Sequence, residues 1–453
     1  MIEKLGKVIT HRKQFITIDN SVEYKRCRVQ VSRKGVVLRD VIKGVAINTK
    51  KQQVCKEGDF LVAEIDAKVG GYGFVGKELE GAIVSSHYFL FEVDESKMLK
   101  DYLAWLIKTN IIQDQISSKG STNYAAIRPS HVLDFEIPLP SIVDQTIIVS
   151  RLNNINAKYS LLDKELTQQQ TYLQLLRQTI LQEAVQGKLT KQNAKDEPAT
   201  ELLKRIKAEK QKLIKAGKLK KEKELPSITE DEIPFELPEG WVWCRLYEVG
   251  ILKRGKSKHR PRNDRNLFIN GTYPFIQTGE VSQAKKQNGL ITSINGYYNE
   301  VGLKQSEMQK QGTLCITIAA NIAEYGFLNI DACVPDSIVC FNAVDEVISK
   351  YVSYFINVSK DMLEQFAPST AQKNINLGIL SELKFPLPPL AEQHHIVAKV
   401  QQLQQQLSQL ETQVQQSREY AQQLLQSVLR EAFEEKGKVY EMGEEKAWMV
   451  AEE

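Results

Sequence analysis

Pro138-Leu139-Pro140 and Pro386-Leu387-Pro388 each open a long helical stretch of the 453-residue chain, and the two stretches are copies of one another. Sliding the sequence by 248 residues superposes the two proline clusters and also places Gln145 on Gln393. The register then runs without a gap as far as Glu431-Ala432. A repeat of this length predicts two copies of one structural module and a pseudo-twofold internal repeat.

The repeat also extends upstream of the prolines, into two globular regions. Tyr72-Gly73-Phe74 matches Tyr325-Gly326-Phe327, and the apolar run 60–65 matches the run 314–318. Two further pairs of segments match, which are Ile83-Val84 with Ile338-Val339, and the helical run 102–107 with the run 351–356. Short apolar runs followed by a helix predict mixed α+β modules.

After each proline cluster, apolar positions recur in alternating steps of four and three, which is the pattern of a coiled-coil seam. In the first stretch the seam is predicted at Ile148, Leu152, Ile155, Tyr159, Leu162, Leu166, Leu173, Leu176 and Ile180. In the second stretch it is predicted at Ile396, Val400, Leu403, Leu407, Leu410, Val414, Leu424 and Val428. A polar residue interrupts both seams at the same step, at Gln169 and at Ser417, which favours pairing of the two helices with each other. The alternative is a plain dimerisation stalk.

The predicted fold class is therefore α+β, with two tandem mixed α/β modules separated by two long helices that form an antiparallel coiled coil. The first module is expected over residues 1–142 and the second over residues 226–388. Residues 143–225 are expected to hold the first helix and a basic helical linker. Residues 389–453 are expected to hold the second helix and a C-terminal tail.

Composition argues against a membrane protein, a secreted protein and a zinc protein. No run approaches eighteen apolar residues and residues 1–4 do not open a signal peptide, which predicts a cytoplasmic protein without a membrane partner. The six cysteines have no metal-ligand spacing and are interpreted as reduced, mostly buried thiols rather than a zinc site. The net charge is only +4, but the stretch 204–223 alone carries +8. That stretch is either a solvated linker helix or a surface for phosphates or for an acidic partner.

Basic and polar loops in both modules are candidate DNA contacts, because arginine and lysine bind phosphates, arginine reads guanine and amides read adenine. Each such residue taken singly is more often an ordinary surface residue. The candidates in the first module are Arg12, Lys13, Lys25, Arg26, Arg28, Arg33, Lys34, Thr122, Asn123 and Tyr124. Those in the second are Lys253, Arg254, Lys256, Lys258, Arg260, Arg262, Arg265, Gln372, Lys373 and Asn374.

One motif matches a nucleotide-binding pattern by its letters but lacks the sequence context that this pattern needs. Residues 250–257 match the phosphate-binding pattern GxxxxGKS, but a basic stretch and Pro261 follow where that motif requires a helix. We find no other constellation for catalysis, no cofactor loop and no metal site. The sequence thus predicts a binding protein without a catalytic or metal site of its own.

The duplicated layout resembles the specificity subunits of Type I restriction-modification systems. The residues that carry the resemblance are the segment 237–243 (Leu-Pro-Glu-Gly-Trp-Val-Trp), the helix entry 386–393 (Pro-Leu-Pro-Pro-Leu-Ala-Glu-Gln) and the end of the first helix at 181–189. The first module departs from this pattern. It begins near Met1 at the position of Arg245, so it is expected to lack a counterpart of 237–243.

The resemblance implies two target recognition domains, each of which reads half of a bipartite site in double-stranded DNA. It also implies two methyltransferase (modification) subunits docked on the helices, and restriction subunits that join the complex. S-adenosylmethionine, ATP and Mg²⁺ are then used by the partners, and this chain is expected to bind no cofactor. We expect the helix pair to set the spacing of the half-sites, about one DNA turn from centre to centre, and affinity to fall steeply with salt. The alternatives are a coiled-coil adaptor without DNA specificity, and a P-loop ATPase.

Overall fold

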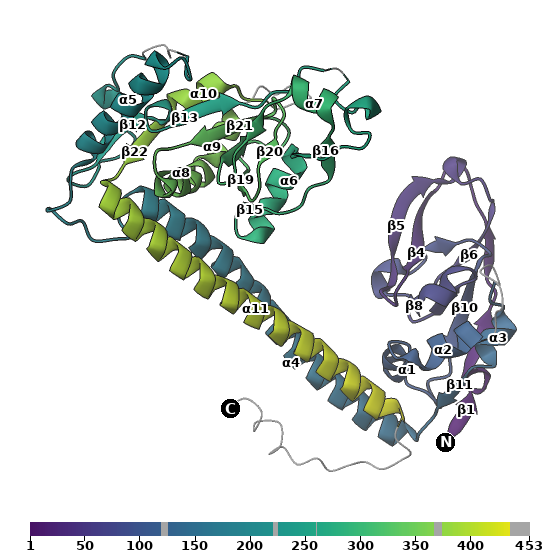
Figure 1. Cartoon of the computed structure of the whole chain (residues 1–453). Coiled ribbons are helices and arrows are strands. Elements are labelled where there is room, and N and C mark those ends of the chain that lie inside the picture. Colours follow the sequence, from purple (N-terminus) through teal and green to yellow (C-terminus); the bar gives the residue numbers. More distant parts are fainter. Residues whose placement is uncertain (119–125, 221–224, 260, 367–373, 435–453) are drawn as a thin grey trace. The chain divides into compact units, whose positions relative to one another are not determined.

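Two apolar runs of the sequence form buried central strands in two similar sheets. Strands β7 (Phe60–Ala63) and β18 (Leu314–Thr317) are buried at every position, as expected for strands that are covered on both faces. In the computed structural model they lie in different units, one made of Met1–Gln168 with Val414–Glu453 and the other of Gln169–Gln413 (Figure 1). The structure describes residues 1–118, 126–220, 225–259, 261–366 and 374–434.

In the first unit, β7 belongs to an antiparallel sheet of order β2-β10-β7-β8. The other strands of this sheet are β2 (Ile9–Arg12), β8 (Tyr72–Phe74) and β10 (Tyr88–Val93). The helices of this module are α1 (Lys100–Leu106), α2 (Asn110–Ser118) and α3 (Pro129–Leu133). Phe60, Phe91 and Tyr102 are fully buried in one apolar core.

A second sheet of the first unit has the order β3-β6-β9-β4-β5. Its strands are β3 (Phe15–Thr17), β4 (Glu23–Gln30), β5 (Gly35–Lys43), β6 (Lys51–Val54) and β9 (Ile83–Val84). The long β4–β5 hairpin carries a bulge at Arg26/Cys27, and a bulge redirects the side chains that follow it. As a result Cys27 and Val29 point into an apolar core, whereas Arg28 is exposed.

The second unit repeats the first sheet, because the order β2-β10-β7-β8 recurs as β13-β21-β18-β19, with β15 added at the edge. The strands of this sheet are β13 (Ile251–Arg254), β15 (Leu290–Ile291), β18, β19 (Tyr325–Leu328) and β21 (Ile338–Asn342). The helices α8 (Glu346–Val358), α9 (Lys360–Gln365) and α10 (Leu377–Glu382) follow in the same order as α1 to α3. The duplication predicted from sequence is therefore present in the core of both modules.

The remaining sheet of the second unit differs from its counterpart. It has the order β16-β14-β20-β17 and mixes parallel with antiparallel pairs. Its strands are β14 (Tyr273–Phe275), β16 (Gly296–Tyr298), β17 (Met308–Gln309) and β20 (Ala332–Cys333), and the nearby helices are α6 (Thr278–Gln283) and α7 (Glu300–Gln305). Each module thus combines a shared core with a sheet of its own.

The strand order corrects one predicted equivalence. Ile83-Val84 form β9 of the unshared sheet, whereas Ile338-Val339 begin β21 of the shared sheet. The true counterpart of β21 is β10, since both strands lie between the same two neighbours. Two apolar residues carry too little pattern to fix a register, which explains the mismatch.

A two-stranded ribbon closes each module and also corrects the predicted start of the first one. Strand β1 (Ile2–Lys4) pairs with β11 (Glu136–Pro138), and β12 (Val242–Arg245) pairs with β22 (Lys384–Leu387). Ile2 faces Pro138 where Trp243 faces Pro386, so Ile2 takes the place of Trp243. The first module therefore includes the last residues of the segment that it was expected to lack.

Two helices of similar length complete the repeat, α4 (Ile142–Val185) and α11 (Leu390–Glu434). In the first unit, Arg418 of α11 donates from Nε to Asp163 of α4 over 3.1 Å. In the second unit, Arg177 donates to Glu411 over 3.1 Å. In the first unit Val149 and Leu152 share a core with Leu429 and Phe433, and Asp163 further along α4 meets Arg418, so the two helices are antiparallel there.

The line of contact differs from the predicted seam at four steps. Leu152, Leu166, Ile180, Ile396, Val400 and Leu407 are buried, and Ile148, Ile155, Tyr159, Leu173, Leu403, Val414 and Val428 are half-buried. Leu162, Leu176, Leu410 and Leu424 are instead exposed. The next residue along the chain faces the partner helix at three of these four steps, namely Asp163, Arg177 and Glu411. Ion pairs therefore occupy steps where leucine was expected.

One glutamine in the first turns of each long helix is fully buried. Gln145 donates from Nε2 to the carbonyls of Lys97 and Pro140, and its Oε1 accepts the Leu99 N–H over 2.8 Å. Its counterpart Gln393 donates to the Pro388 carbonyl over 2.9 Å. These amides fasten each helix start to the preceding loop. None of the described helices is both long and apolar enough to cross a membrane.

Candidate nucleic-acid interface

The basic residues of the β4–β5 hairpin divide into paired and unpaired cations. Arg26 forms two hydrogen bonds with Asp40, of 2.7 and 2.6 Å, and this contact lowers the pKa of the Asp40 carboxyl. Lys25 only donates to the Glu78 carbonyl over 3.3 Å, and Arg28 is exposed. Lys25 and Arg28 are thus two hairpin cations that remain for an anionic ligand.

The tip of this hairpin is fixed by Arg33. Its backbone is in the left-handed region, with φ of 61°. Its Nη1 donates to the carbonyls of Lys108 and Thr109, over 3.0 and 2.6 Å, and to Asn110 Oδ1 over 3.0 Å. Arg33 therefore holds the hairpin against the start of α2, while the neighbouring Lys34 is exposed.

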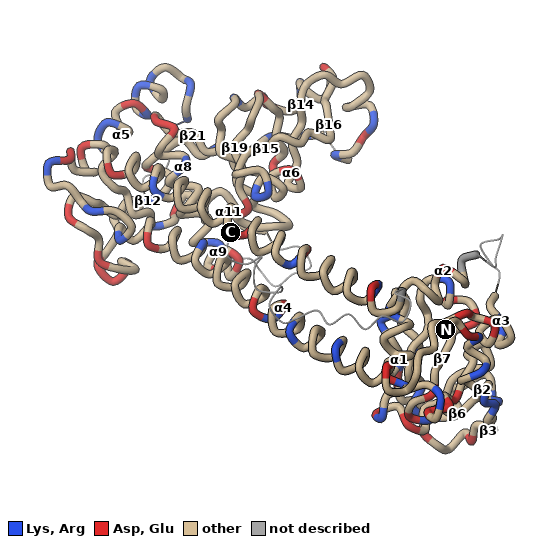
Figure 2. The backbone as a smooth tube through the Cα atoms, turned by 90° about the horizontal axis from the view of Figure 1, so that it is seen from below, with Lys and Arg blue, Asp and Glu red and all other residues tan. Residues whose placement is uncertain are grey.

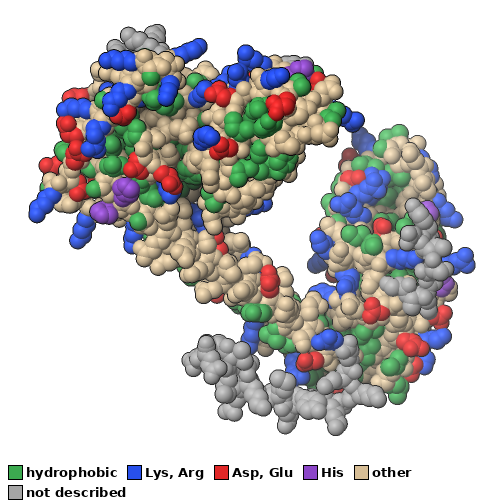
Figure 3. All heavy atoms as spheres, viewed as in Figure 1, with side chains coloured by type: hydrophobic (Ala, Val, Ile, Leu, Met, Phe, Trp, Pro, Cys, Tyr) green, Lys and Arg blue, Asp and Glu red, His purple; other side chains and the backbone are tan. Residues whose placement is uncertain are grey.

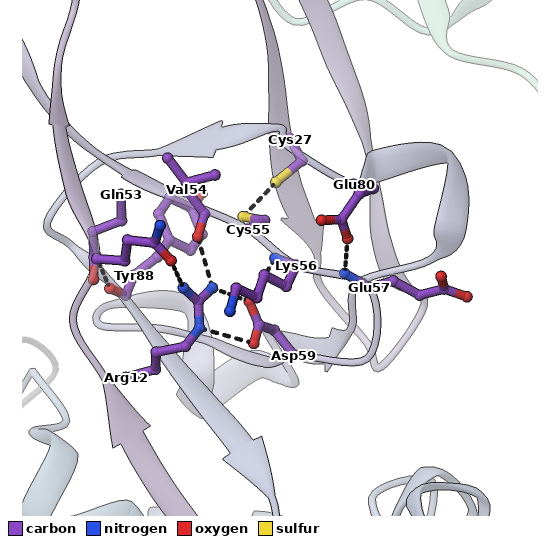
Figure 4. A network of polar contacts seen from close by, with 11 residues as sticks. Arg12, Cys27, Gln53, Val54, Cys55, Lys56, Glu57, Asp59, Glu80 and Tyr88 are labelled. Carbon is purple, nitrogen blue, oxygen red and sulfur yellow. Dashed lines mark hydrogen bonds and ion pairs between the residues drawn. The ribbon is translucent and has the colours of Figure 1, made fainter.

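Arg12, a predicted DNA contact, is nearly buried in the structure. Its side chain is 11% exposed and forms an ion pair with Asp59, which is 4% exposed. Arg12 also donates from Nη2 to the Val54 carbonyl over 2.7 Å, and Figure 4 shows the guanidinium enclosed between these groups. Arg12 thus joins the two sheets of the first module, and Lys13 beside it is exposed.

The basic segment of the second module, residues 253–265, is also partly neutralised. Lys253 pairs with Glu307, Arg262 pairs with Asp336, and Arg254 donates to the Asp336 carbonyl. A contact between His259 Nε2 and Asp264 of 2.7 Å closes the segment on itself. These acidic partners lie far along the chain from the basic segment, apart from Asp264, and single-sequence reasoning did not find them.

In the part of the chain that the structure describes, nine predicted cations make no ion pair. Two of them, Arg33 and Arg254, donate to backbone carbonyls instead. The other seven are Lys13, Lys25, Arg28, Lys34, Lys256, Lys258 and Arg265. All are exposed except Lys256, which is half-buried. Sequence reasoning passed over Lys51, an exposed cation that lies 4.8 Å from the Phe15 ring centroid. The alternating pattern of β3 and β6 was the signal for that pair.

Six predicted contacts lie outside the described residues, namely Thr122, Asn123, Tyr124, Arg260, Gln372 and Lys373. Asn374 is described; it is exposed and forms an isolated bridge with Ala319.

The backbone of residues 250–257, which match the phosphate-loop pattern, does not have the conformation of a phosphate loop. Strand β13 runs through its middle, and Gly255 and Lys256 donate their N–H groups to the Ile338 and Val334 carbonyls. A phosphate loop requires free N–H groups at the start of a helix. These two N–H groups are already bound within the module.

The basic stretch 204–223 falls largely on helix α5 (Ala199–Lys215), which packs its apolar side on the second module. Four of its cations have a glutamate partner within 2.8 Å, and these are Lys204, Arg205, Lys207 and Lys212. Figure 2 shows the resulting mixture of blue and red segments around α5. Lys215, Lys218 and Lys220 make no ion pair with the described residues, so the open charge lies at the end of the helix.

The cysteines and the described carboxylates do not gather into a metal-binding cluster. All six cysteines are free and buried. No group of three potential metal ligands was found among residues 1–118, 126–220, 225–259, 261–366 and 374–434. Cys27 and Cys55 lie with their sulfurs 3.6 Å apart inside the first module (Figure 4).

One of the two tryptophans of the segment 237–243, Trp241, lies at the helix junction of the second unit. Trp241 donates from Nε1 to Glu392 over 2.7 Å, and Gln192 and Thr190 donate to the same carboxylate over 3.1 and 3.3 Å. Glu392 is nearly fully buried, and burial raises the pKa of its carboxyl. This carboxylate links the start of α11 to the residues that follow α4.

We expect Glu392→Gln to remove a pH-dependent part of the stability. A carboxyl whose folded-state pKa is raised stabilises the fold below its ordinary value of 4.5, and this contribution is lost as the pH rises through the folded-state pKa. The free energy of unfolding of wild type minus variant should therefore fall with pH, by about 1.4 kcal/mol per unit of raised pKa. Denaturant unfolding at pH 4, 6 and 8 measures this difference. The exposed Glu239→Gln is the matched control, and a flat difference for Glu392→Gln would contradict the prediction.

Comparison with known proteins identifies the family. Residues 4–169 and 238–418 match the family described as Type I restriction modification DNA specificity domain. The chain is 33% identical over 239 residues to the Type I restriction enzyme EcoEI specificity subunit of Escherichia coli. That match covers 50% of this chain and 39% of the relative, so the chain spans well under two thirds of the relative's length.

Two solved structures share the fold over nearly the whole chain. One is a chain from a structure on complex assembly and conformational transition of the type I R-M system, with a TM-score of 0.69 and 19% identity over 95% of this chain and 97% of that one. The other is the HsdS subunit from Thermoanaerobacter tengcongensis, with a TM-score of 0.56 and 20% identity over 96% of both chains. The family match covers well over half of the sequence, and the chain belongs to the family of Type I restriction-modification DNA specificity subunits.

Proposed function

We propose that this chain reads a bipartite site in double-stranded DNA, one half-site per module, for a Type I restriction-modification complex. The observation that carries the proposal is the shared core of the two modules, each with a sheet of its own beside it. A constant scaffold with variable attachments suits recognition of two different half-sites. The proposed domain limits are 1–142 and 226–388 for the recognition domains, and 143–225 and 389–453 for the helical regions.

The unpaired cations support contact with DNA. Lys25, Arg28 and Lys34 lie on one long hairpin of the first module, and Lys258 and Arg265 lie in the basic segment of the second. Cations without an internal partner can neutralise phosphates, and an arginine among them can read a guanine edge. Candidates already in ion pairs, such as Arg26 and Arg262, would first have to leave a carboxylate.

The long helices are the proposed dock for the partner subunits. Apolar side chains are exposed along both of them, and these are Val143, Ile147, Leu161, Leu162, Tyr172, Leu175, Leu176, Leu410, Tyr420 and Leu424. Figure 3 shows green side chains reaching the surface along the helices. Exposed apolar side chains in such number favour a protein partner. We assign this dock to two methyltransferase subunits, which restriction subunits then join, in the cytoplasm.

In this proposal the chemistry belongs to the partners. S-adenosylmethionine, ATP and Mg²⁺ are used there, and this chain contributes recognition and spacing. The helix pair is proposed to set the distance between the half-sites, so that a longer pair should change the unspecified spacer and leave both half-sites unchanged.

Exchanging residues 1–142 for the equivalent module of a related specificity subunit should change one half of the methylated motif. The physical reason is that the first module has its own core and its own second sheet. The measurement is a methylation map of DNA from cells that carry the chain and its methyltransferase partner, with the chain deleted as the control.

A bipartite motif that disappears on deletion and changes in one half on exchange supports the proposal. An unchanged methylation map, with the methyltransferase shown to be present, contradicts it and favours a coiled-coil adaptor. Changes in both halves after the exchange would contradict the assignment of one half-site to each module.

A further inference from the structure

Gln305, the last residue of α7, lies against the basic segment of the second module and binds its backbone. Its Oε1 accepts the N–H groups of Lys258 and His259, over 2.7 and 3.1 Å. The next residue, Ser306, donates from its hydroxyl to the Lys256 carbonyl over 2.8 Å. Gln305 and the residue that follows α7 therefore bind three backbone groups between Lys256 and His259.

The start of the segment is equally fixed. Gly255 donates its N–H to the Ile338 carbonyl over 2.8 Å, and Lys256 donates to the Val334 carbonyl over 3.0 Å. A Cβ atom at residue 255 would overlap the Pro335 carbonyl oxygen, so only glycine allows this close approach. The N–H groups of residues 255, 256, 258 and 259 thus all have protein partners.

Helix α7, which carries Gln305 at its end, is itself held firmly in the second module. Asn299 caps α7 by accepting the Val301 and Gly302 N–H groups, and it donates to the Asn266 and Ile269 carbonyls over 2.9 and 3.0 Å. Beside α7, Tyr298 is fully buried and stacks on Phe275 with ring centroids 4.1 Å apart. Gln305 therefore projects from a rigid element rather than from a loose loop.

The bound backbone carries cations that differ in their ion pairing. The flanking cations Lys253 and Arg262 are neutralised by Glu307 and Asp336. Between them, Lys256 and Lys258 make no ion pair with the residues that the structure describes. Gln305 and Ser306 therefore hold the backbone that carries Lys256 and Lys258, which are two of the cations available for DNA.

We propose that Gln305 is a positioning residue that sets the base preference of the second module by fixing the backbone from Lys256 to His259. The proposal rests on the proposed function. Gln305 does not itself read a base in this account. It acts through the segment it binds, because a base contact discriminates only when its donor is held in place.

The test uses the purified complex of the full chain with its methyltransferase subunits and short DNA duplexes. Methylation rates are measured on the cognate duplex and on duplexes with one base pair changed in either half-site. Gln305→Ala removes the acceptor, Gln305→Glu keeps an acceptor oxygen, and Gln311→Ala removes an exposed glutamine of the same module as the control. Hydrogen exchange of the Lys258 and His259 amides is measured on the same variants, without DNA.

Gln305→Ala should lower discrimination in the half-site of the second module by about 10- to 100-fold. Discrimination in the other half-site should stay within about twofold, and the Lys258 and His259 amides should exchange faster. Gln305→Glu should keep its discrimination, with slower methylation overall because it adds a negative charge beside the DNA. Gln311→Ala should match the wild type in both readouts.

Three results would overturn the proposal. These are unchanged discrimination in Gln305→Ala, an equal loss in both half-sites, and failure of Gln305→Glu to retain discrimination. Failure of the proposed function is recognised separately, because the wild-type complex would then discriminate in neither half-site.

Discussion

Asp59→Ala is expected to lower the free energy of unfolding of the first module by about 3–5 kcal/mol. The substitution leaves Arg12 as a nearly buried cation without a carboxylate, since its Nε donates to Asp59 Oδ1 over 3.1 Å in the wild type. It also removes the acceptor for the Lys56 N–H, a bond of 2.7 Å. Removing one member of a buried ion pair costs more than the pair contributes, because the remaining charge stays buried.

The measurement is denaturant unfolding of the full chain, with amide hydrogen exchange in β2 and β6 to locate the loss in the first module. Asp40→Ala is the matched control, because Arg26 and Asp40 are 23% and 33% exposed. That control should cost no more than about 1 kcal/mol. Equal costs for the two substitutions would show that Arg12 and Asp59 do not behave as a buried pair. On the proposed function, Asp59→Ala should also reduce recognition of one half-site only.

Arg12 and Lys13 show where sequence reasoning about the interface reaches its limit. Both belong to one basic run, and neighbouring residues of a strand point to opposite sides. Which of the two is enclosed depends on Asp59, which lies 47 residues away in the chain. The same holds for the Lys253 and Arg262 partners, Glu307 and Asp336. A single sequence identifies the cations but not the distant carboxylates that neutralise some of them.

The repeated core was predictable because it rests on apolar patterns that occur twice. The runs that became β7 and β18 are buried at every residue, so both copies retain the same character. The unshared sheets have no second copy with which to compare them, and β9 has only two residues. The equivalence drawn through Ile83-Val84 failed at such a place.

The helix pair was predictable in its existence and only partly in its contacts. Steps of four and three identified the helices and their pairing. They do not distinguish Leu162 from the adjacent Asp163, because both fall near the same edge of the seam. In the structure Asp163 pairs with Arg418, whose side chain is 22% exposed, whereas Leu162 is 40% exposed. At such steps a charged residue of one long helix pairs with a charged residue of the other. A pattern of apolar residues contains no information on these long-range ion pairs.

Gln145→Ala is expected to cost about 3 kcal/mol, and Gln393→Ala about 1 kcal/mol, although the two residues are equivalent in the repeat. Gln145 makes three hydrogen bonds, to Leu99, Lys97 and Pro140. Gln393 donates to Pro388, and its Oε1 is buried without a hydrogen-bond partner among the described residues. A buried polar group left without its partner costs about 1–3 kcal/mol, so the cost should follow the number of bonds lost.

The difference between the two costs tests whether the two helix starts are fastened unequally. Denaturant unfolding of each variant gives the cost, and hydrogen exchange at Leu99 reports the lost bond in the first unit directly. Gln401→Ala, at an exposed position of α11, is the control and should change stability by less than about 0.5 kcal/mol. Equal costs for Gln145→Ala and Gln393→Ala would mean that burial of the amide, rather than its bonds, determines the loss. The duplicated helix start would then have kept the same energetics in both copies despite the different bonding.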